Sequence, residues 1–181
     1  MKFSTLIFLF VLCFSLTSCY EKLDFDQLDN YVYKPIFTSS LTSFTLVPGQ
    51  FFNSQGVQEN SIVDETRFEI FEANIVKDNV VQLDFYAEIK NEFDRDVTIN
   101  IDFLDDNDRE IYTFSTINVR SGELNFTYLE EIEISQNPDI VNVTKVKIEA
   151  SLENTATQMN PNSTEEFEFK SSVTAYIQTK L

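Results

Sequence analysis

The chain has 181 residues, and its 30 acidic and 13 basic side chains give a formal net charge of −17. A surface this acidic repels phosphate backbones and anionic lipid, so we expect no nucleic-acid partner, and a membrane link would have to be covalent. Histidine is absent, which excludes Ser-His-Asp and Cys-His catalysis and removes the commonest transition-metal ligand. We therefore expect a protein that is not an enzyme and has no cofactor.

An apolar segment over residues 6–14 opens the chain, and Lys2 is the only charge before it. Its length suits the hydrophobic region of a signal peptide. It is short for a bilayer-spanning helix, which needs roughly 20 apolar residues. The segment predicts a signal peptide over residues 1–18, with an uncleaved membrane helix or cleavage elsewhere as the alternatives.

The leader ends in Leu16-Thr17-Ser18-Cys19, which resembles the lipobox of bacterial lipoproteins: an aliphatic, a small or β-branched and a small residue before cysteine. The resemblance implies that residues 1–18 are removed and that the thiol of Cys19 receives a diacylglyceryl group. Acylation of the freed amine would then add a further chain, and two or more chains hold a protein stably on a membrane. The implied location is the cell envelope, as an outer-membrane lipoprotein.

Residues 19–35 are predicted to be a tether between the lipid and a folded domain. Acidic Glu21, Asp24 and Asp26 follow Cys19 closely and resemble the export signals of Bacteroidota-type surface lipoproteins, although Lys22 departs from their usual order. The resemblance implies display on the cell surface. A solvated linker without any signal is the alternative.

From residue 31 onward, apolar residues alternate with polar ones, which predicts strands with one buried face. The alternation is clearest over residues 81–89 and 97–103. Between residues 111 and 119 the apolar residues change from even to odd positions, which predicts a bulge near Ser115 and Thr116. Asn137-Pro138-Asp139 could start a single helical turn. Residues 51–61 read as a loop. Other strands are expected over residues 41–47, 67–72, 111–119, 124–134, 146–152 and 167–177.

About seven to nine strands with little helix predict an all-β fold over residues 36–181. Two antiparallel sheets packed face to face would bury every apolar face in one core. We describe this as an immunoglobulin-like β-sandwich in architecture only, because the Cys–Trp–Cys signature is missing. A closed barrel is the alternative. Residues 84–114 resemble a segment of uncharacterised Bacteroidota-type lipoproteins and sandwich domains of the late-embryogenesis-abundant type 2 kind, which implies the sandwich but no site.

The densest group of oxygen ligands is Asp105-Asp106-Asn107-Asp108. Calcium binds several carboxylate and carbonyl oxygens on flexible loops, which makes Asp105, Asp106 and Asp108 weak metal candidates. The EF-hand pattern fails here because Arg109 falls on a ligand position and no glycine follows. The alternative is a solvated hairpin turn, since Asp and Asn are favoured in turns.

Four aromatic residues could stack on a sugar: Phe51, Phe52, Tyr86 and Tyr176. An exposed pair beside a groove would favour glycan binding, whereas burial of all four would exclude it. The alternative is that the two phenylalanines cover an open end of the sandwich.

Neighbouring carboxylates do not make a glycosidase pair, because Glu130 and Glu131 would point to opposite faces of a strand. The sequence therefore predicts a lipid-anchored envelope protein that serves as a non-enzymatic accessory or interaction module. Its partners would be the membrane, through the lipid on Cys19, and an envelope protein or glycan. The alternative functions are surface glycan binding and a calcium-stabilised, adhesion-like domain.

Overall fold

A computed structural model describes residues 31–180 of the chain. The predicted signal peptide, Cys19 and the tether as far as residue 30 lie outside the described residues. The chain divides into two units, residues 1–32 with 180–181 and residues 33–179, and the second of these is the folded domain discussed below. Within the described part, no helix is long and apolar enough to cross a membrane.

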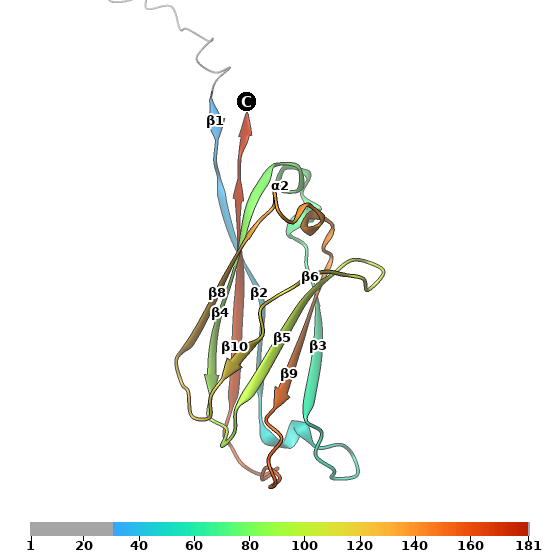
Figure 1. The fold of residues 1–181 in the computed structure, drawn as a ribbon, viewed down its shortest axis with the longest axis vertical. Coiled ribbons are helices and arrows are strands. Elements are labelled where there is room, and N and C mark those ends of the chain that lie inside the picture. Colours follow the sequence, from blue (N-terminus) through green and yellow to red (C-terminus); the bar gives the residue numbers. More distant parts are fainter. Residues whose placement is uncertain (1–30, 181) are drawn as a thin grey trace, which may run out of the picture. The chain divides into compact units, whose positions relative to one another are not determined.

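Strands account for 52% of the structure and helix for 12%. One antiparallel sheet has four strands in the order β2-β10-β4-β8. Its strands are β2 (Ile36–Leu46), β10 (Phe167–Ile177), β4 (Val80–Asn91) and β8 (Phe126–Glu133). Figure 1 shows β8, β4, β10 and β2 as one layer of the domain, with β5, β9 and β3 in a second layer.

The second sheet has five strands in the order β3-β9-β5-β6, and β7 also pairs with β5. Its strands are β3 (Ser61–Arg67), β9 (Lys145–Leu152), β5 (Val97–Leu104), β6 (Glu110–Thr113) and β7 (Ile117–Val119). Two short strands, β1 (Val32–Tyr33) and β11 (Thr179–Lys180), form a separate pair. The helical elements are η2 (Pro48–Phe51), η3 (Ile70–Glu72), α2 (Asn74–Asn79) and η4 (Pro138–Asn142).

The antiparallel pairs of the domain are nested in the sequence. β2 pairs with β10, β3 with β9, β4 with β8, and β5 with both β6 and β7. A sandwich in which the chain is wound in this way is a jelly roll. The predicted antiparallel all-β sandwich is confirmed. Its strand order differs from the immunoglobulin order, in which the consecutive strands A and B lie side by side.

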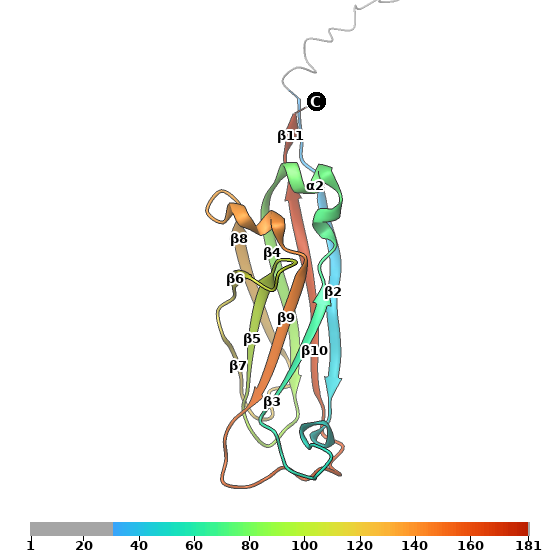
Figure 2. The same cartoon turned by 90° about the vertical axis from the view of Figure 1, so that its right-hand side faces the viewer.

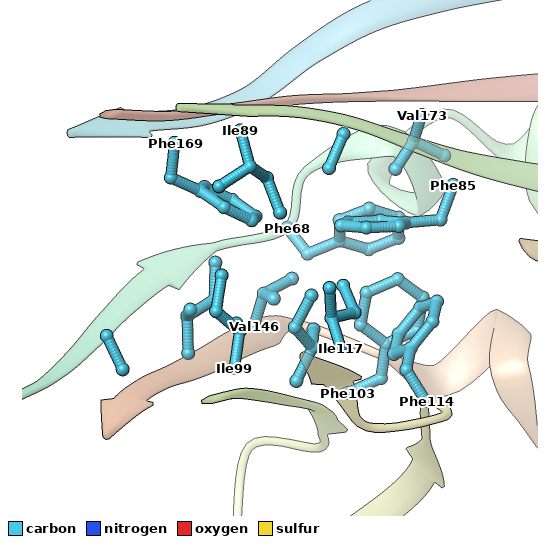
Figure 3. Packing of buried hydrophobic residues seen from close by; sticks show 14 of the residues in the cluster. Phe68, Phe85, Ile89, Ile99, Phe103, Phe114, Ile117, Val146, Phe169 and Val173 are labelled. Atoms are coloured by element: carbon cyan, nitrogen blue, oxygen red, sulfur yellow. The ribbon is translucent and has the colours of Figure 1, made fainter. Parts of the chain in front are cut away.

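The core lies between the two sheets, where the apolar faces of their strands meet (Figure 3). Phe103 of β5 packs edge-on against Phe114, with ring centroids 4.7 Å apart, and Phe85 of β4 contacts the same ring from the opposite sheet, also at 4.7 Å. Each fully buried side chain of this size contributes roughly 1.5–3 kcal/mol. The alternation seen in the sequence is therefore the alternation between core and solvent.

Two local predictions hold and one is wrong. Three residues, 114–116, separate β6 from β7 and face only two residues of β5, so the extra residue predicted near Ser115 is confirmed. The helical turn predicted at Asn137 is η4. The strand predicted over residues 67–72 is wrong, because Phe68 and Phe71 are both buried and their spacing of three requires the turn η3. The strand β3 lies before it and begins at the end of the predicted loop.

Candidate functional site

Asp105 organises the turn between β5 and β6. Its Oδ1 accepts hydrogen bonds from the backbone N–H groups of Asn107 (2.8 Å) and Arg109 (3.0 Å), and its Oδ2 accepts one from Nε of Arg109 (3.2 Å). The bonds from Arg109 and Asn107 outweigh desolvation and hold the pKa of Asp105 below its usual value. Asp108, at φ 60°, pairs with Lys145. This is the hairpin turn that the sequence offered as the alternative to a metal loop.

The structure does not bring Asp105, Asp106 and Asp108 together around a common point. Across residues 31–180, no group of three or more Asp, Glu, His or Cys side chains could hold a metal ion. Asp105 and Asp106 instead line a cleft of about 530 Å³ beside η3 and η4. Charged side chains of both signs line this cleft: the basic Arg67, Lys77 and Lys145 and the acidic Glu69, Glu72, Asp105 and Asp106.

Phe51 and Phe52 do not form a ligand surface. The Phe51 side chain is only 1% exposed and meets Phe93 edge-on, with ring centroids 6.1 Å apart. Phe52 is half-buried against the core. Burial removes Phe51 from the predicted sugar-stacking group. Both rings pack against the core, as the alternative of a covered sandwich end predicts.

Tyr86 and Tyr176 do lie on a common surface, the outer face of the β2-β10-β4-β8 sheet. Tyr86 is 36% exposed and donates a hydrogen bond from its hydroxyl to Glu88 (3.1 Å). Tyr176 is half-buried and donates to Asp84 (2.8 Å), which raises the pKa of Tyr176 through that bond and the Asp84 charge. Tyr176 is opposite Gln82 in the sheet, so four positions, or roughly 13 Å, separate the two tyrosines along β4.

The outer face of this sheet is a candidate surface that extends across four strands. The strand register arranges its side chains in rows that cross all four strands. One row contains Ser40, Ser172, Tyr86 and Leu129, and the next contains Ser43, Lys170, Glu88 and Thr127. Hydroxyl groups dominate on β2, whereas the outer face of β8 carries two carboxylates, Glu131 and Glu133, beside Thr127 and Leu129. The face therefore changes in charge from one edge to the other.

Glu130 is the residue that the sequence analysis missed as a structural centre. Its carboxylate accepts hydrogen bonds from the hydroxyls of Tyr112 (2.5 Å) and Tyr128 and from the backbone N–H of Ser115 (3.1 Å). Burial raises the pKa of Glu130, but these hydrogen bonds outweigh it and leave the value below the usual one. Burial, and then the hydrogen bond to Glu130, raise the pKa of Tyr112 to about 12. The sequence does contain one sign of this role: Glu130 occupies a position between Tyr128 and Ile132 where the alternation predicts an apolar residue.

Glu130 joins the two sheets at one side of the sandwich. It lies on β8, the edge strand of the first sheet, whereas Tyr112 lies on β6, the edge strand of the second. A charge-assisted hydrogen bond is roughly twice as strong as a neutral one. The cluster of Glu130, Tyr112, Tyr128 and Ser115 therefore closes this edge of the sandwich.

Comparison with known proteins gives no family for this chain: no protein-family model and no curated protein matches it. A candidate secreted protein from Parabacteroides distasonis has a similar structure, with 16% identity and a TM-score of 0.49 over 64% of this chain and 38% of its own. The VP2 protein of infectious bursal disease virus has 11% identity and a TM-score of 0.42 over 80% of this chain and 32% of its own. A protein of the Bacillus endospore appendages, which form pili, has 11% identity and a TM-score of 0.36 over 82% of this chain and 93% of its own.

The chain thus spans less than two fifths of the length of the Parabacteroides and viral proteins. Similarity at this level does not indicate a shared activity, ligand or partner. The function has to be inferred from the residues of the chain itself.

Proposed function

We propose that this protein is a non-enzymatic module that a lipid on Cys19 holds on the cell envelope, where its jelly-roll domain binds another envelope component. One observation carries the proposal: Leu16-Thr17-Ser18-Cys19 lies one residue after an apolar segment of signal-peptide length. The full chain has a net charge of −17 and gains no electrostatic attraction to anionic lipid. A covalent lipid is then the link to the membrane that this charge favours.

The hydrogen bonding of the carboxylates supports a role without catalysis. A general acid that works near neutral pH needs a raised pKa, whereas the three donors around Glu130 hold the pKa of this carboxyl below its usual value. Asp105 is bound in the same way by the N–H groups of its own turn. Both carboxyls therefore have a pKa below the usual value, which is the opposite of what a general acid near neutral pH requires.

Replacing Cys19 tests the anchor. The Cys19→Ala chain should no longer be labelled by a fatty-acid analogue and should stay unprocessed or leave the membrane fraction. Cys13→Ala is the matched control, since Cys13 is the only other cysteine of the chain and lies in the apolar segment. Its labelling should equal that of the unchanged protein. Continued lipid labelling of Cys19→Ala would refute the proposal.

Glycan binding is the second candidate, and the exposed ring of Tyr86 favours it. Hydroxyl groups of Ser40 and Ser172 lie in the same row as this ring, which gives a surface that combines an aromatic face with hydrogen-bonding groups. Titration calorimetry of the full chain with a panel of soluble polysaccharides tests it. Binding should be lost in Tyr86→Ala and kept in Leu129→Ala, a change in the same row. Equal binding by both variants would exclude this surface.

A further inference from the structure

The edge strands of the sandwich differ sharply in charge. Natural sheets protect their edges with charged residues or proline, because an unpaired edge can pair with a strand of another chain. Three edge strands follow this rule: β8 carries Glu130, Glu131 and Glu133, β3 carries Asp64, Glu65 and Arg67, and β6 carries Glu110. β2 has eleven residues, none of them charged and none of them proline.

The uncharged edge extends beyond the strand itself. No residue from 35 to 58 carries a charge, in a chain of which 24% of the residues are charged. β2 ends the order β2-β10-β4-β8 and, among the strands of residues 31–180, pairs with β10 only. Ile36 and Phe37 are 60% and 46% exposed. Figure 2 shows β2 and β8 at opposite edges of their sheet. β2 therefore offers a long, uncharged row of backbone groups to a further strand.

We propose that β2 pairs antiparallel with β2 of a second copy of this chain, so that two four-stranded sheets join into one sheet of eight strands. The distribution of charge favours a second copy as the partner and β2 as the site of contact. Two copies of a chain with net charge −17 repel each other wherever their acidic surfaces meet. They approach at the lowest cost along the strand that has no charge. A symmetric dimer also needs a surface that is complementary to itself.

The bulge in β2 supplies that complementarity. Lys170 of β10 pairs with Ser43 and Ser172 pairs with Ser40, so two residues of β2, Leu41 and Thr42, lie opposite one residue of β10. Such a bulge reverses which parity of the strand faces the core. Odd positions therefore face inward before it and even positions after it.

A two-fold axis between Leu41 and Thr42 then matches inner residues with inner ones and outer residues with outer ones. Without the bulge, this register would set core-facing residues against solvent-facing ones. Paired hydroxyl residues are among the stabilising cross-strand neighbours. The register gives these pairs between the copies: Thr38 with Thr45 and Ser40 with Ser43 on the outer face, and Phe37 with Leu46 and Ser39 with Phe44 on the inner face.

The side of the sandwich beneath β2 has room for the inner residues of the second copy. A groove of about 450 Å³ runs between β2 and β3 and includes Leu41, Phe68 and Ile70 in its lining. A second hollow of about 210 Å³ continues along the same two strands, beside Phe44 and Ile62. When an added strand extends a sheet, its backbone supplies affinity and pockets for its side chains supply specificity. The inward phenylalanines of the second copy would cover the apolar residues of this opening, beside the polar Thr66, Arg67 and Glu69 of its lining.

The pairing is compatible with two lipid anchors on one membrane, a point that alone rests on the proposed function. Antiparallel pairing sets Ile36 of the two copies about 36 Å apart, the length of an eleven-residue strand. Residues 19–30 reach at most about 40 Å from the lipid. Both anchors can therefore insert in the same membrane when the joined sheet lies parallel to its surface.

Sedimentation of the full chain in detergent tests the dimer, with the mass of two chains expected. Ser40→Lys/Ser43→Lys sets like charges opposite each other in both halves of the interface and should weaken association by about a hundredfold. Thr127→Lys/Leu129→Lys adds the same charges in the same two rows at the β8 edge and should leave the dimer intact. A monomer in the unchanged protein, or equal effects of both variants, would overturn the proposal.

Cysteine pairs test the register without depending on the lysine variants. Thr38→Cys/Thr45→Cys should form disulfides between chains, because directly opposite residues have Cβ atoms within about 5.5 Å. Thr38→Cys/Ser43→Cys shifts the register by two residues on the same face and should remain reduced, since diagonal neighbours are about 7–8 Å apart. The unchanged chain gives the background from Cys13 and Cys19. Equal cross-linking of the two pairs, or none in either, would overturn the pairing.

Discussion

β2 and β8 are the two edge strands of one sheet, and they differ in charge and in the contacts that their side chains make. β8 carries three glutamates in eight residues, and one of these, Glu130, bonds to Tyr112 of the opposite sheet. β2 carries no charge in eleven residues and borders a groove instead. The β8 edge is thus closed by the chain's own side chains, whereas the β2 edge is left for another strand.

The difference shows that burial of apolar side chains in the core does not determine whether an edge strand is protected or free to pair. Both strands present apolar residues inward: Phe44 of β2 stacks on Phe169 at 5.1 Å, and Ile132 of β8 is 1% exposed. What separates them is the polar chemistry at the rim. A carboxylate with three donors fixes one side, while hydroxyl groups leave the other side neutral and open to pairing.

The largest effect on stability is expected from removing Glu130, whose hydrogen bonds close the β8 edge. Glu130→Ala leaves the hydroxyls of Tyr112 and Tyr128 and the N–H of Ser115 without their acceptor, which should lower the free energy of unfolding by about 2 kcal/mol. Urea denaturation of the purified full chain measures it. Glu131→Ala is the matched control, since this exposed neighbour faces solvent, and should change stability by less than about 0.5 kcal/mol. Equal losses would mean that the cluster does not close the edge.

A smaller loss of folding stability is expected at acidic and at alkaline pH. The pKa of Glu130 lies below its usual value in the folded state, so its contribution is present above the unfolded pKa and is lost as the pH falls through the folded one. The pKa of Tyr112 rises from 10.0 to about 12, so its contribution is present below pH 10 and is lost between pH 10 and about 12.

Thermal melting across this range measures both losses. Tyr112→Phe should be less stable near neutral pH and should flatten the alkaline part of the curve. Tyr86→Phe is the control because its hydroxyl bonds to Glu88 on the open face. If Tyr112→Phe leaves the alkaline loss unchanged, the hydrogen bond between Tyr112 and Glu130 contributes little.

The smallest effect on stability should come from making β8 resemble β2. Glu131→Thr/Glu133→Thr removes two outward charges while Glu130 keeps the cluster, and the free energy of unfolding should change by less than about 0.5 kcal/mol. Self-association should nevertheless rise, because the charges that protect this edge are gone. Sedimentation would then detect species larger than two chains. A mass that does not change would show that charge is not what protects β8.

Much of the fold could be predicted from local sequence, and the strand order could not. Alternation over residues 81–89 and 97–103 records which side of each strand is buried, and burial is a local property of a strand. Pairing joins segments as distant as Thr38 and Thr174, and no local pattern contains this information. The strand β3 was missed because adjacent Ile62 and Val63, followed by charged residues, give an edge strand little alternation.

The candidate surfaces were predictable to different degrees. The absence of charge over residues 35–58 is plain in the sequence, but its meaning depends on β2 being an edge strand, which only the sheet order shows. Phe51 could not be assigned from sequence, because a loop phenylalanine can face either solvent or the open end of a sandwich. Asp105 suits a turn and a calcium loop equally well until its hydrogen-bond donors are known.

Amide hydrogen exchange at rising protein concentration compares the two edges most directly. Amide groups of β2 that point away from β10 should become protected as the concentration of the full chain in detergent increases, because a second β2 then accepts their hydrogen bonds. Those of β8 should exchange at an unchanged rate. Protection of β2 that does not depend on concentration, or that appears equally in β8, would contradict the pairing of β2 with a second copy.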